Sequence, residues 1–190
     1  RTRRRLMLSI CIPAYTHARY TVEAVKSILS QDSDVEVIVL DDFSSVEPGS
    51  EDFPYIEQAY GVFRSDPRVR SFQNSVSLPI QDNWNKAVSL SSRRFVKLMG
   101  ADDRIALGGL EMLIERLNSA SDGVFHAHLA TVIDESGESL RLQRPYVLDA
   151  EGFSVGGRHA LKLKLRQIAR FKEPVCNVFL KKRWGDLGGY

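Results

Sequence analysis

The sequence predicts an α/β fold in which a mainly parallel sheet is flanked by helices. Short runs of apolar and β-branched residues, each the length of one strand, alternate with segments whose apolar residues recur at helical spacing. Several of these strand-like runs end in carboxylate or amide side chains, as expected where parallel strands finish at one edge of a sheet.

Length and composition indicate one ordinary globular domain. The chain has 190 residues, of which 43% are hydrophobic and 26% charged, which is enough for a single sizeable core. The formal net charge is only +2, and most of the excess lies in the arginine-rich residues 1–5, so we expect no nucleic-acid partner. Residues 1–5 are predicted to be a disordered basic arm. A weak peripheral contact of this arm with an anionic membrane surface stays open.

The cysteines and the apolar runs bear on location. Cys11 and Cys176 each lie in an apolar run, which favours buried thiols in a reducing compartment over a disulfide. No apolar run approaches the ~18 residues of a membrane span, and no signal-peptide-like region follows the arginines. The sequence therefore predicts a cytoplasmic protein.

The first predicted unit is a strand, a helix and a second strand. Residues 6–12 form an apolar strand, which Pro13 is expected to end because proline cannot donate to a sheet ladder. Residues 20–30 have helical spacing, and residues 35–40 are rich in β-branched side chains. A helical crossover makes the two strands parallel, so the segments after them share one edge of the sheet. Those segments contain Pro13, Ala14, Tyr15, Asp41 and Asp42.

A third strand and another helix come next. Residues 68–73 are a more polar strand, suited to the margin of a sheet, and they end at Asn74. Residues 83–90 are predicted to be a helix with Asp82 as its N-cap.

A second pair of carboxylates follows the next strand. Residues 95–99 form a short buried strand, Gly100 lets the backbone turn, and Asp102 and Asp103 follow at the edge where α/β sheets bind ligands. Adjacent carboxylates there suit a divalent cation that carries a substrate phosphate. The alternative is that one of them caps the helix predicted over residues 107–117.

The C-terminal part predicts an added hairpin. Residues 124–133 alternate in polarity and residues 139–142 follow a turn, a pattern typical of two antiparallel strands. Residues 157–171 predict a basic amphipathic helix, and residues 175–180 a last strand.

Taken in order, four segments resemble the family 2 glycosyltransferases of the GT-A fold, which is Rossmann-like. The segments are LSICIPAY (8–15), VIVLDDFS (37–44), NWNKA (83–87) and FVKLMGADD (95–103). The similarity covers about residues 6–117 and is weaker through residues 175–190. It implies one GT-A domain over residues 6–190, with a nucleotide-sugar-binding part at about 6–120 and a partial acceptor-side part at about 121–190.

The resemblance also implies roles for the site residues. The nucleotide would be bound by Pro13, Ala14, Tyr15, Asp41, Asp42, Asn85 and Asp102. Asp41 would accept a hydrogen bond from the base or ribose, with Asp42 supporting it, whereas Asn85 could equally be a buried amide that ties a loop in place. Asp102 and Asp103 match the family's metal motif, which holds Mn²⁺ or Mg²⁺ against the diphosphate. Such a cation neutralises the charge that departs with the diphosphate.

The implied activity is inverting transfer of a sugar from a nucleotide-diphospho-sugar, a UDP-sugar being the first expectation. The acceptor would be a hydroxyl of a carbohydrate, lipid-linked or protein substrate. This reaction needs a general base. In the family the base is a carboxylate downstream of a stretch like residues 187–190, so we expect it beyond Tyr190 and expect this chain to be truncated; Asp186 precedes the glycine pair and is not assigned the role. A nucleotide-sugar-binding module without turnover and a nucleotidyltransferase of similar fold are the alternatives.

Overall fold

The computed structural model describes residues 7–16, 18–44, 63, 65–118, 126–127, 130–143 and 177–189. The predicted arm (1–5) and the predicted helix over 157–171 lie outside the described residues. The elements in chain order are β1 (Leu8–Ala14), α1 (Ala18–Leu29), β2 (Val35–Asp41), β3 (Val69–Gln73), α3 (Ile80–Leu90), β4 (Phe95–Leu98), α4 (Gly109–Asn118), β5 (His126–Ala127), β6 (Ala130–Ile133), β7 (Ser139–Gln143), β8 (Asn177–Leu180) and α6 (Lys181–Asp186).

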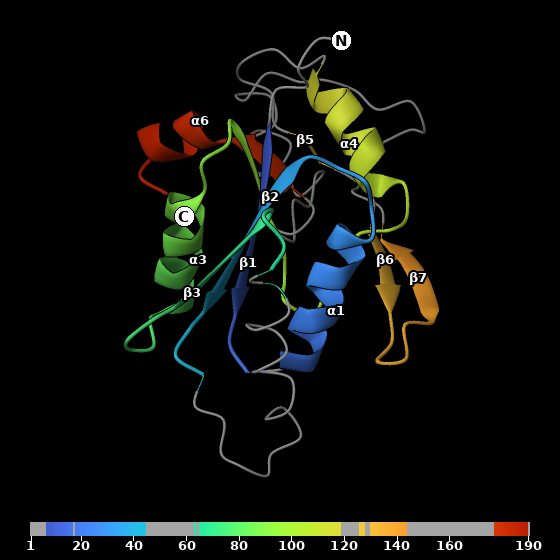
Figure 1. Cartoon of the computed structure of the whole chain (residues 1–190), viewed down its shortest axis with the longest axis horizontal. Coiled ribbons are helices and arrows are strands. Elements are labelled where there is room, and N and C mark those ends of the chain that lie inside the picture. The colour runs from blue at the N-terminus through green and yellow to red at the C-terminus, as the bar shows by residue number, and fades with distance from the viewer. Residues whose placement is uncertain are drawn as a thin grey trace, which may run out of the picture.

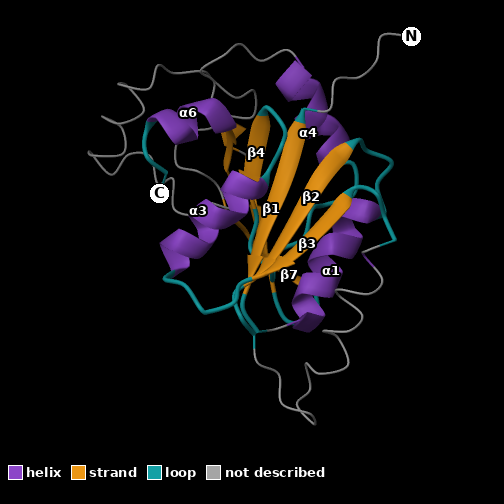
Figure 2. Cartoon of the chain, turned by 60° about the vertical axis from the view of Figure 1, so that its left-hand side comes forward, coloured by secondary structure: helices purple, strands orange, loops and turns teal. Residues whose placement is uncertain are grey.

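A six-stranded sheet in the order β3-β2-β1-β4-β8-β5 forms the centre of the fold (Figure 1 and Figure 2). β3, β2, β1 and β4 run parallel to one another, whereas β8 runs antiparallel to both β4 and β5. The polar strand β3 lies at an edge, and β6 and β7 form a separate antiparallel hairpin. The predicted α/β class, with a mainly parallel sheet and an added hairpin, is confirmed.

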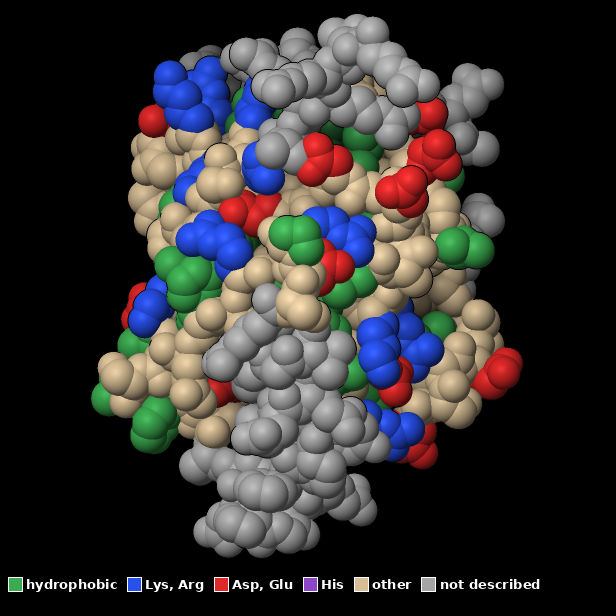
Figure 3. Space-filling view, in the orientation of Figure 1, with side chains coloured by type: hydrophobic (Ala, Val, Ile, Leu, Met, Phe, Trp, Pro, Cys, Tyr) green, Lys and Arg blue, Asp and Glu red, His purple; other side chains and the backbone are tan. Residues whose placement is uncertain are grey.

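Helices cover both faces of the sheet, and each face has its own apolar cluster. α1 and α4 pack on one face, where Val25 and Leu110 meet strand residues such as Ile10. α3 covers the opposite face (Figure 2), where Ala87 and Val88 belong to the second apolar cluster. In the part of the chain that the structure describes, no helix is long and apolar enough to cross a membrane. On the face drawn in Figure 3, basic and acidic side chains are interspersed.

Contrary to the sequence prediction, Pro13 does not end β1. The strand continues to Ala14, which pairs with Asp41 of β2. Alternate residues of a strand direct their backbone groups to the same side, and the Cys11 carbonyl accepts the N–H of Met99 on the β4 side. Pro13 faces that side too, where the pairing with β4 has already ended. The missing N–H therefore removes no hydrogen bond of the ladder between β1 and β2.

The prediction that Asp82 caps a helix is wrong. α3 begins earlier, its N-cap position is Pro79, and no side chain caps it. The Asn83 N–H already donates to the Pro79 carbonyl at 3.0 Å, so Asp82 lies within the first turn. A carboxylate in a first turn still complements the helix dipole.

Two further predictions are corrected after β4. Leu107 was expected on the apolar face of a helix, but α4 starts after it and its side chain is 89% exposed. The single strand predicted over 124–133 is divided: β5 pairs with β8 in the main sheet, whereas β6 pairs with β7. A period-two pattern gives the polarity of a strand but not its partner, so it could not reveal this division.

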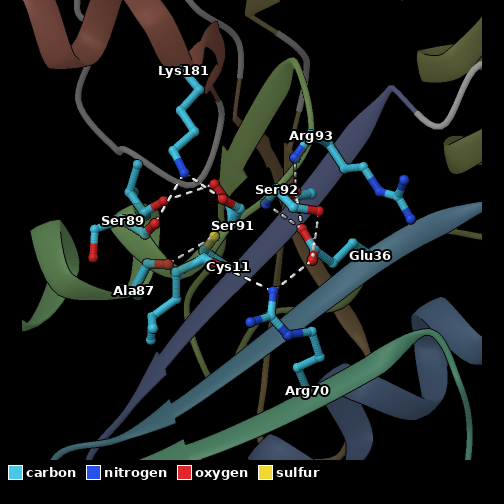
Figure 4. Close-up of polar contacts among 12 residues, drawn as sticks. Cys11, Glu36, Arg70, Ala87, Ser89, Ser91, Ser92, Arg93 and Lys181 are labelled. Carbon is cyan, nitrogen blue, oxygen red and sulfur yellow. Dashed lines mark hydrogen bonds and ion pairs between the residues drawn. The ribbon is translucent and has the colours of Figure 1, made fainter.

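A buried polar network ties the strands together at the end opposite their carboxyl edge (Figure 4). The Glu36 carboxylate of β2 accepts hydrogen bonds from Ser9 Oγ at 2.5 Å, Arg70 Nη1 at 2.9 Å, and the N–H and Oγ of Ser92 at 2.7 and 2.9 Å. These donors come from β1, β3 and the segment before β4. Lys181 caps the C-terminal end of α3 by donating to the carbonyls of Ser89 and Ser91.

Candidate functional site

The segments that hold the predicted site residues meet at the carboxyl edge of the parallel strands. β1 lies between β2 and β4, and its register places Ala14 beside Asp41 and Cys11 beside Leu98. Leu98 is therefore level with Ile38, three residues before Asp41, so the end of β4 is two strand spacings to the side of the end of β2 and roughly 14 Å from it. Between them lies the loop after β1, which begins with the exposed side chain of Tyr15.

Asp41, the last residue of β2, is held in place by donors from two directions. Its side chain is nearly inaccessible, since the residue is 3% exposed. Ser44 donates its Oγ–H to Oδ1 at 2.5 Å and its N–H to Oδ2 at 3.1 Å, and Gln73 Nε2 donates to Oδ2 at 2.8 Å. The Thr16 N–H donates to Ser44 Oγ at 2.8 Å. Asp41 thus fixes its own turn and, through Ser44, the loop after β1.

Asp42 holds the segment between β3 and α3. Its carboxylate accepts from Asn74 Nδ2 at 2.7 Å, from Ser77 Oγ at 2.9 Å, and from the Leu78 N–H at 2.9 Å. Asn74 also donates to Asn83 Oδ1 at 2.9 Å, which links the network to α3. These contacts make Asp42 a support for the edge of the sheet, and its contact with a nucleotide stays a prediction.

Asp102 and Asp103 converge on the space above Gly100. A Cβ atom on Gly100 would lie 2.8 Å from Asp102 Oδ1 and 2.8 Å from Asp103 Oδ2. Asp103 Oδ2 also accepts the Gly100 N–H at 3.1 Å, which closes the turn. A side chain at this position would therefore have to displace both carboxylates, so glycine allows them to converge. The alternative that either residue caps the next helix is wrong, since α4 begins at Gly109.

The carboxylate pair suits a cation that is shared with a ligand. Among the described residues, no three His, Cys, Asp or Glu side chains gather into a complete metal cage. Mn²⁺ and Mg²⁺ at phosphate sites characteristically use one or two carboxylates and complete their shell with phosphate oxygens and water. Asp102 is exposed and Asp103 is half-buried, so a ligand can reach both. The chemistry of these residues fits such a cation.

Arg104, directly after the pair, fastens this segment to α1. Its guanidinium donates to Glu23 Oε2, and its Nη1 lies 2.8 Å from where a Cβ on Gly137 would be. Gly137 belongs to the turn between β6 and β7. Arg104 therefore lies between α1 and the hairpin and anchors the backbone that carries Asp103.

The remaining predicted residues are not all brought to one point. Pro13 and Ala14 belong to the end of β1, and Ala14 is buried at 4% exposure. Asn85 of α3 lies against the C-terminal turn, since its Oδ1 would be 2.7 Å from a Cβ on Gly189. Gly189 has φ +88°, a conformation that favours glycine.

Sequence reasoning missed the residues that orient the site. Ser44, Gln73 and Thr16 fix Asp41, and Asn74 fixes Asp42. The spacing of Asp41 and Ser44 was a usable signal, because Asp and Ser side chains commonly bond backbone groups within a turn. Gln73 and Asn74 lie on another strand, and only the register of β3 brings them near.

A mainly parallel sheet with carboxylates at its carboxyl edge is typical of α/β domains that bind phosphate-bearing ligands. Residues 9–183 match the family described as glycosyl transferase family 2. The chain belongs to this family.

Curated relatives and solved structures agree with this assignment. The GalNAc(5)-diNAcBac-PP-undecaprenol beta-1,3-glucosyltransferase of Campylobacter jejuni is 30% identical over 133 residues, which are 68% of this chain and 40% of that protein. The chain spans 34% to 40% of the length of the curated relatives it matches.

Two solved structures share the fold. TarS 1–349 of S. aureus, in complex with UDP-GlcNAc, has a TM-score of 0.61 at 18% identity, over 96% of this chain and 48% of that one. The mannosyltransferase PcManGT of Pyrobaculum calidifontis, in complex with GDP-Man and Mn²⁺, has a TM-score of 0.61 at 14% identity, over 96% and 47%. At these identities the likeness shows the GT-A fold.

Proposed function

We propose that this chain forms the donor-binding part of an inverting, metal-dependent glycosyltransferase. The observation that carries the proposal is the convergence of Asp102 and Asp103 over Gly100, in the segment after β4, at the same edge of the sheet as Asp41. A nucleoside diphosphate is long enough to extend from one of these places to the other. Membership of glycosyl transferase family 2 supports the same reading.

Each side chain then has a stated task. Asp41 accepts a hydrogen bond from the base or ribose, and Pro13, Ala14 and Tyr15 line the nucleoside pocket. Asp42 and Asn85 support that pocket through the segments they contact. The nucleotide-binding part is about residues 6–120, and residues 121–190 contribute to the acceptor side.

The reaction breaks the bond between the anomeric carbon and the diphosphate as an acceptor hydroxyl attacks that carbon from the opposite face. Asp102 and Asp103 would hold Mn²⁺ or Mg²⁺, which supplies neutralisation of the departing diphosphate. The hydroxyl must lose its proton during the attack, and a positioned base typically contributes about 10²–10⁴-fold. The family pattern implies that this base lies beyond Tyr190.

Substrates and location are part of the proposal. A UDP-sugar is our first expectation for the donor, supported by a structural neighbour solved with UDP-GlcNAc, although another was solved with GDP-Man. The acceptor is a carbohydrate, lipid-linked or protein hydroxyl, and one relative is named for a polyprenyl-diphosphate substrate. We place the reaction in the cytoplasm, where a buried free thiol such as Cys11 is common, with peripheral membrane association through the basic arm as an option.

Calorimetric titration with UDP, GDP and dTDP, each with and without Mn²⁺, tests the proposal. We expect at least one nucleoside diphosphate to bind, and to bind far more weakly without the metal. If none of the three binds in the presence of Mn²⁺, the proposal is wrong.

The variant Asp103→Asn tests the metal role directly. Losing one charged ligand should weaken Mn²⁺-dependent binding at least roughly tenfold, whereas a residue that only closes a turn would cost about 1 kcal/mol of stability. Glu115→Gln, an exposed change on α4, serves as the charge-matched control. Normal binding by Asp103→Asn together with a lower melting temperature would assign Asp103 a structural role instead.

A further inference from the structure

Phe43 adopts a backbone conformation that aromatic residues rarely occupy. Its φ is +56°, in the left-handed region, yet the side chain is 49% exposed. Glycine takes this conformation without a steric penalty, whereas a bulky side chain is strained in it. Burial of the ring does not offset the strain, because half of the residue remains open. An exposed, strained aromatic side chain beside a candidate site is a reason to look for a ligand contact.

The surrounding turn explains why the strain persists. Asp41 and Ser44 flank Phe43, and both carboxylate oxygens of Asp41 accept from Ser44, one from the hydroxyl and one from the N–H. This pair of bonds closes the turn and fixes the backbone of Phe43 between them. The side chain is consequently held outward from a rigid turn at the end of β2.

A second exposed aromatic side chain lies on the neighbouring loop. Tyr15 is 59% exposed and is followed by Thr16, which also has φ +56°. The Thr16 N–H donates to Ser44 Oγ at 2.8 Å, so the two loops are fastened to each other. Ala14 and Asp41 are the last paired residues of β1 and β2. Tyr15 follows Ala14 directly, and Phe43 is two positions after Asp41.

We propose that Phe43 stacks on the nucleobase of the donor, as an aromatic contact additional to Tyr15. This inference rests on the proposed function and adds Phe43 to it. A base presents a planar π-face to aromatic side chains and N–H groups to an acceptor. Asp41 Oδ1 has Ser44 Oγ as its described donor, and a carboxylate oxygen accepts two hydrogen bonds. A planar ring that bears N–H groups therefore matches this place, because its face can stack on Phe43 and an N–H group can donate to Asp41.

The size of the effect follows from stacking energies. A stacked base is worth on the order of 1–3 kcal/mol by substitution, which corresponds to about a 5- to 150-fold change in Kd. Because Tyr15 remains in place, we expect the lower end of this range on removing the Phe43 ring. Removing it with glycine also relieves the left-handed strain, so the folded state should not suffer.

The test compares Phe43→Gly with the unaltered chain, using UDP, GDP and inorganic pyrophosphate as probes in the presence of Mn²⁺. We expect the Kd of UDP or GDP to rise about five- to tenfold, the Kd of pyrophosphate to stay unchanged, and the melting temperature not to fall. Phe43→Tyr should retain the affinity for the nucleotide. Met112→Ala, which removes an exposed apolar side chain from α4, is the matched control and should change neither value.

Three results would overturn the inference: unchanged nucleotide binding by Phe43→Gly, an equal loss of nucleotide and pyrophosphate binding, or a loss in Phe43→Tyr as large as in Phe43→Gly. If the unaltered chain binds nucleoside diphosphates but Phe43→Gly binds them equally well, the proposed function stands and the role of Phe43 fails. If the unaltered chain binds none of the probes, both fail.

Discussion

Replacing Glu36 with glutamine should lower the free energy of unfolding by about 2 kcal/mol at neutral pH. The Glu36 side chain is 6% exposed. Its Oε2 accepts from Ser9 Oγ and the Ser92 N–H, and its Oε1 from Ser92 Oγ and Arg70 Nη1 (Figure 4). Glutamine keeps the shape but replaces one acceptor oxygen with a donor group.

The magnitude follows from which bonds glutamine can keep. The amide oxygen must take the Oε2 position, because the Ser92 N–H cannot turn round, and the amide nitrogen then meets Ser92 Oγ and Arg70. The Ser92 hydroxyl can accept a hydrogen bond from the amide nitrogen. The Arg70 side chain is 46% exposed and still donates to the Leu90 carbonyl at 3.0 Å. The bond from Arg70 to residue 36 is lost, because two donors would face each other, but Arg70 is half-exposed and losing this bond costs little. The main cost is the weakening of the bonds from Ser9 Oγ and the Ser92 N–H from charge-assisted to ordinary ones, about 1 kcal/mol each.

The loss should depend on pH with a definite sign. Burial alone would raise the pKa of Glu36, but the hydrogen bonds from Ser9, Ser92 and Arg70 together hold it below its ordinary value of 4.5. A carboxyl whose pKa is lower in the folded state adds stability above its unfolded pKa and loses that contribution as the pH falls through the folded pKa. The difference between the two proteins should therefore be greatest near pH 7 and shrink below about pH 4.5.

Urea unfolding followed by tryptophan fluorescence, at several pH values between 7 and 4, measures this difference. Arg70→Met is the control: it removes one half-exposed partner and should cost no more than about 1 kcal/mol. A loss in Glu36→Gln that is the same at pH 7 and pH 4, or no loss at pH 7, would refute the reasoning. Other carboxyls with lowered pKa values, such as Asp66, are common to both proteins and cancel in the difference.

Two further substitutions test the site and its scaffold. Gly100→Ala places a Cβ 2.8 Å from one carboxylate oxygen of Asp102 and one of Asp103. It should raise the Kd for UDP with Mn²⁺ at least roughly tenfold in calorimetry. Gly185→Ala, where a Cβ meets nothing within 4 Å, is the control and should leave this Kd unchanged. Lys181→Met removes the cation at the C-terminal end of α3, where Nζ lies 2.9 Å from the Ser89 carbonyl, and should cost about 1 kcal/mol in thermal unfolding. The same change at the exposed Lys182 should cost less, and equal losses would contradict the capping role.

Local physics explains how much of the fold could be predicted. A β-branched run such as residues 35–40 has few conformations besides a buried strand, and a helical crossover makes its neighbour parallel, so the carboxyl edge could be located from the sequence. The predictions for Pro13, as the end of a strand, and Leu107, as part of a helix face, were wrong because each position depends on the segments around it in the fold. Pro13 is tolerated because its missing donor faces the side where β4 has ended, and Leu107 falls in a turn although its spacing fits a helix face.

The orienting contacts of the site could not be predicted for a related reason. Asn74 donates to Asp42, and Gln73 to Asp41, although the two members of each pair are 32 residues apart in the sequence. Only the register between β2 and β3 sets these contacts, and register follows from packing of the whole sheet.

The two Asp-Asp pairs are identical in sequence and lie at the same edge of the sheet, but Asp41 ends β2 whereas Asp102 comes four residues after the end of β4, and their surroundings give them different capacities. Asp41 and Asp42 are 3% and 5% exposed, and their oxygens accept from side chains and backbone groups that hold three loops together. A cation there would have to displace donors that are buried with the carboxylates, which would leave those donors unpaired at a cost of roughly 1–3 kcal/mol each. Asp102 and Asp103 face the opposite situation, because they are accessible and converge over a glycine that leaves room above it. The buried pair is therefore suited to shaping the edge and presenting at most a single acceptor, and the accessible pair to sharing a cation with a phosphate ligand.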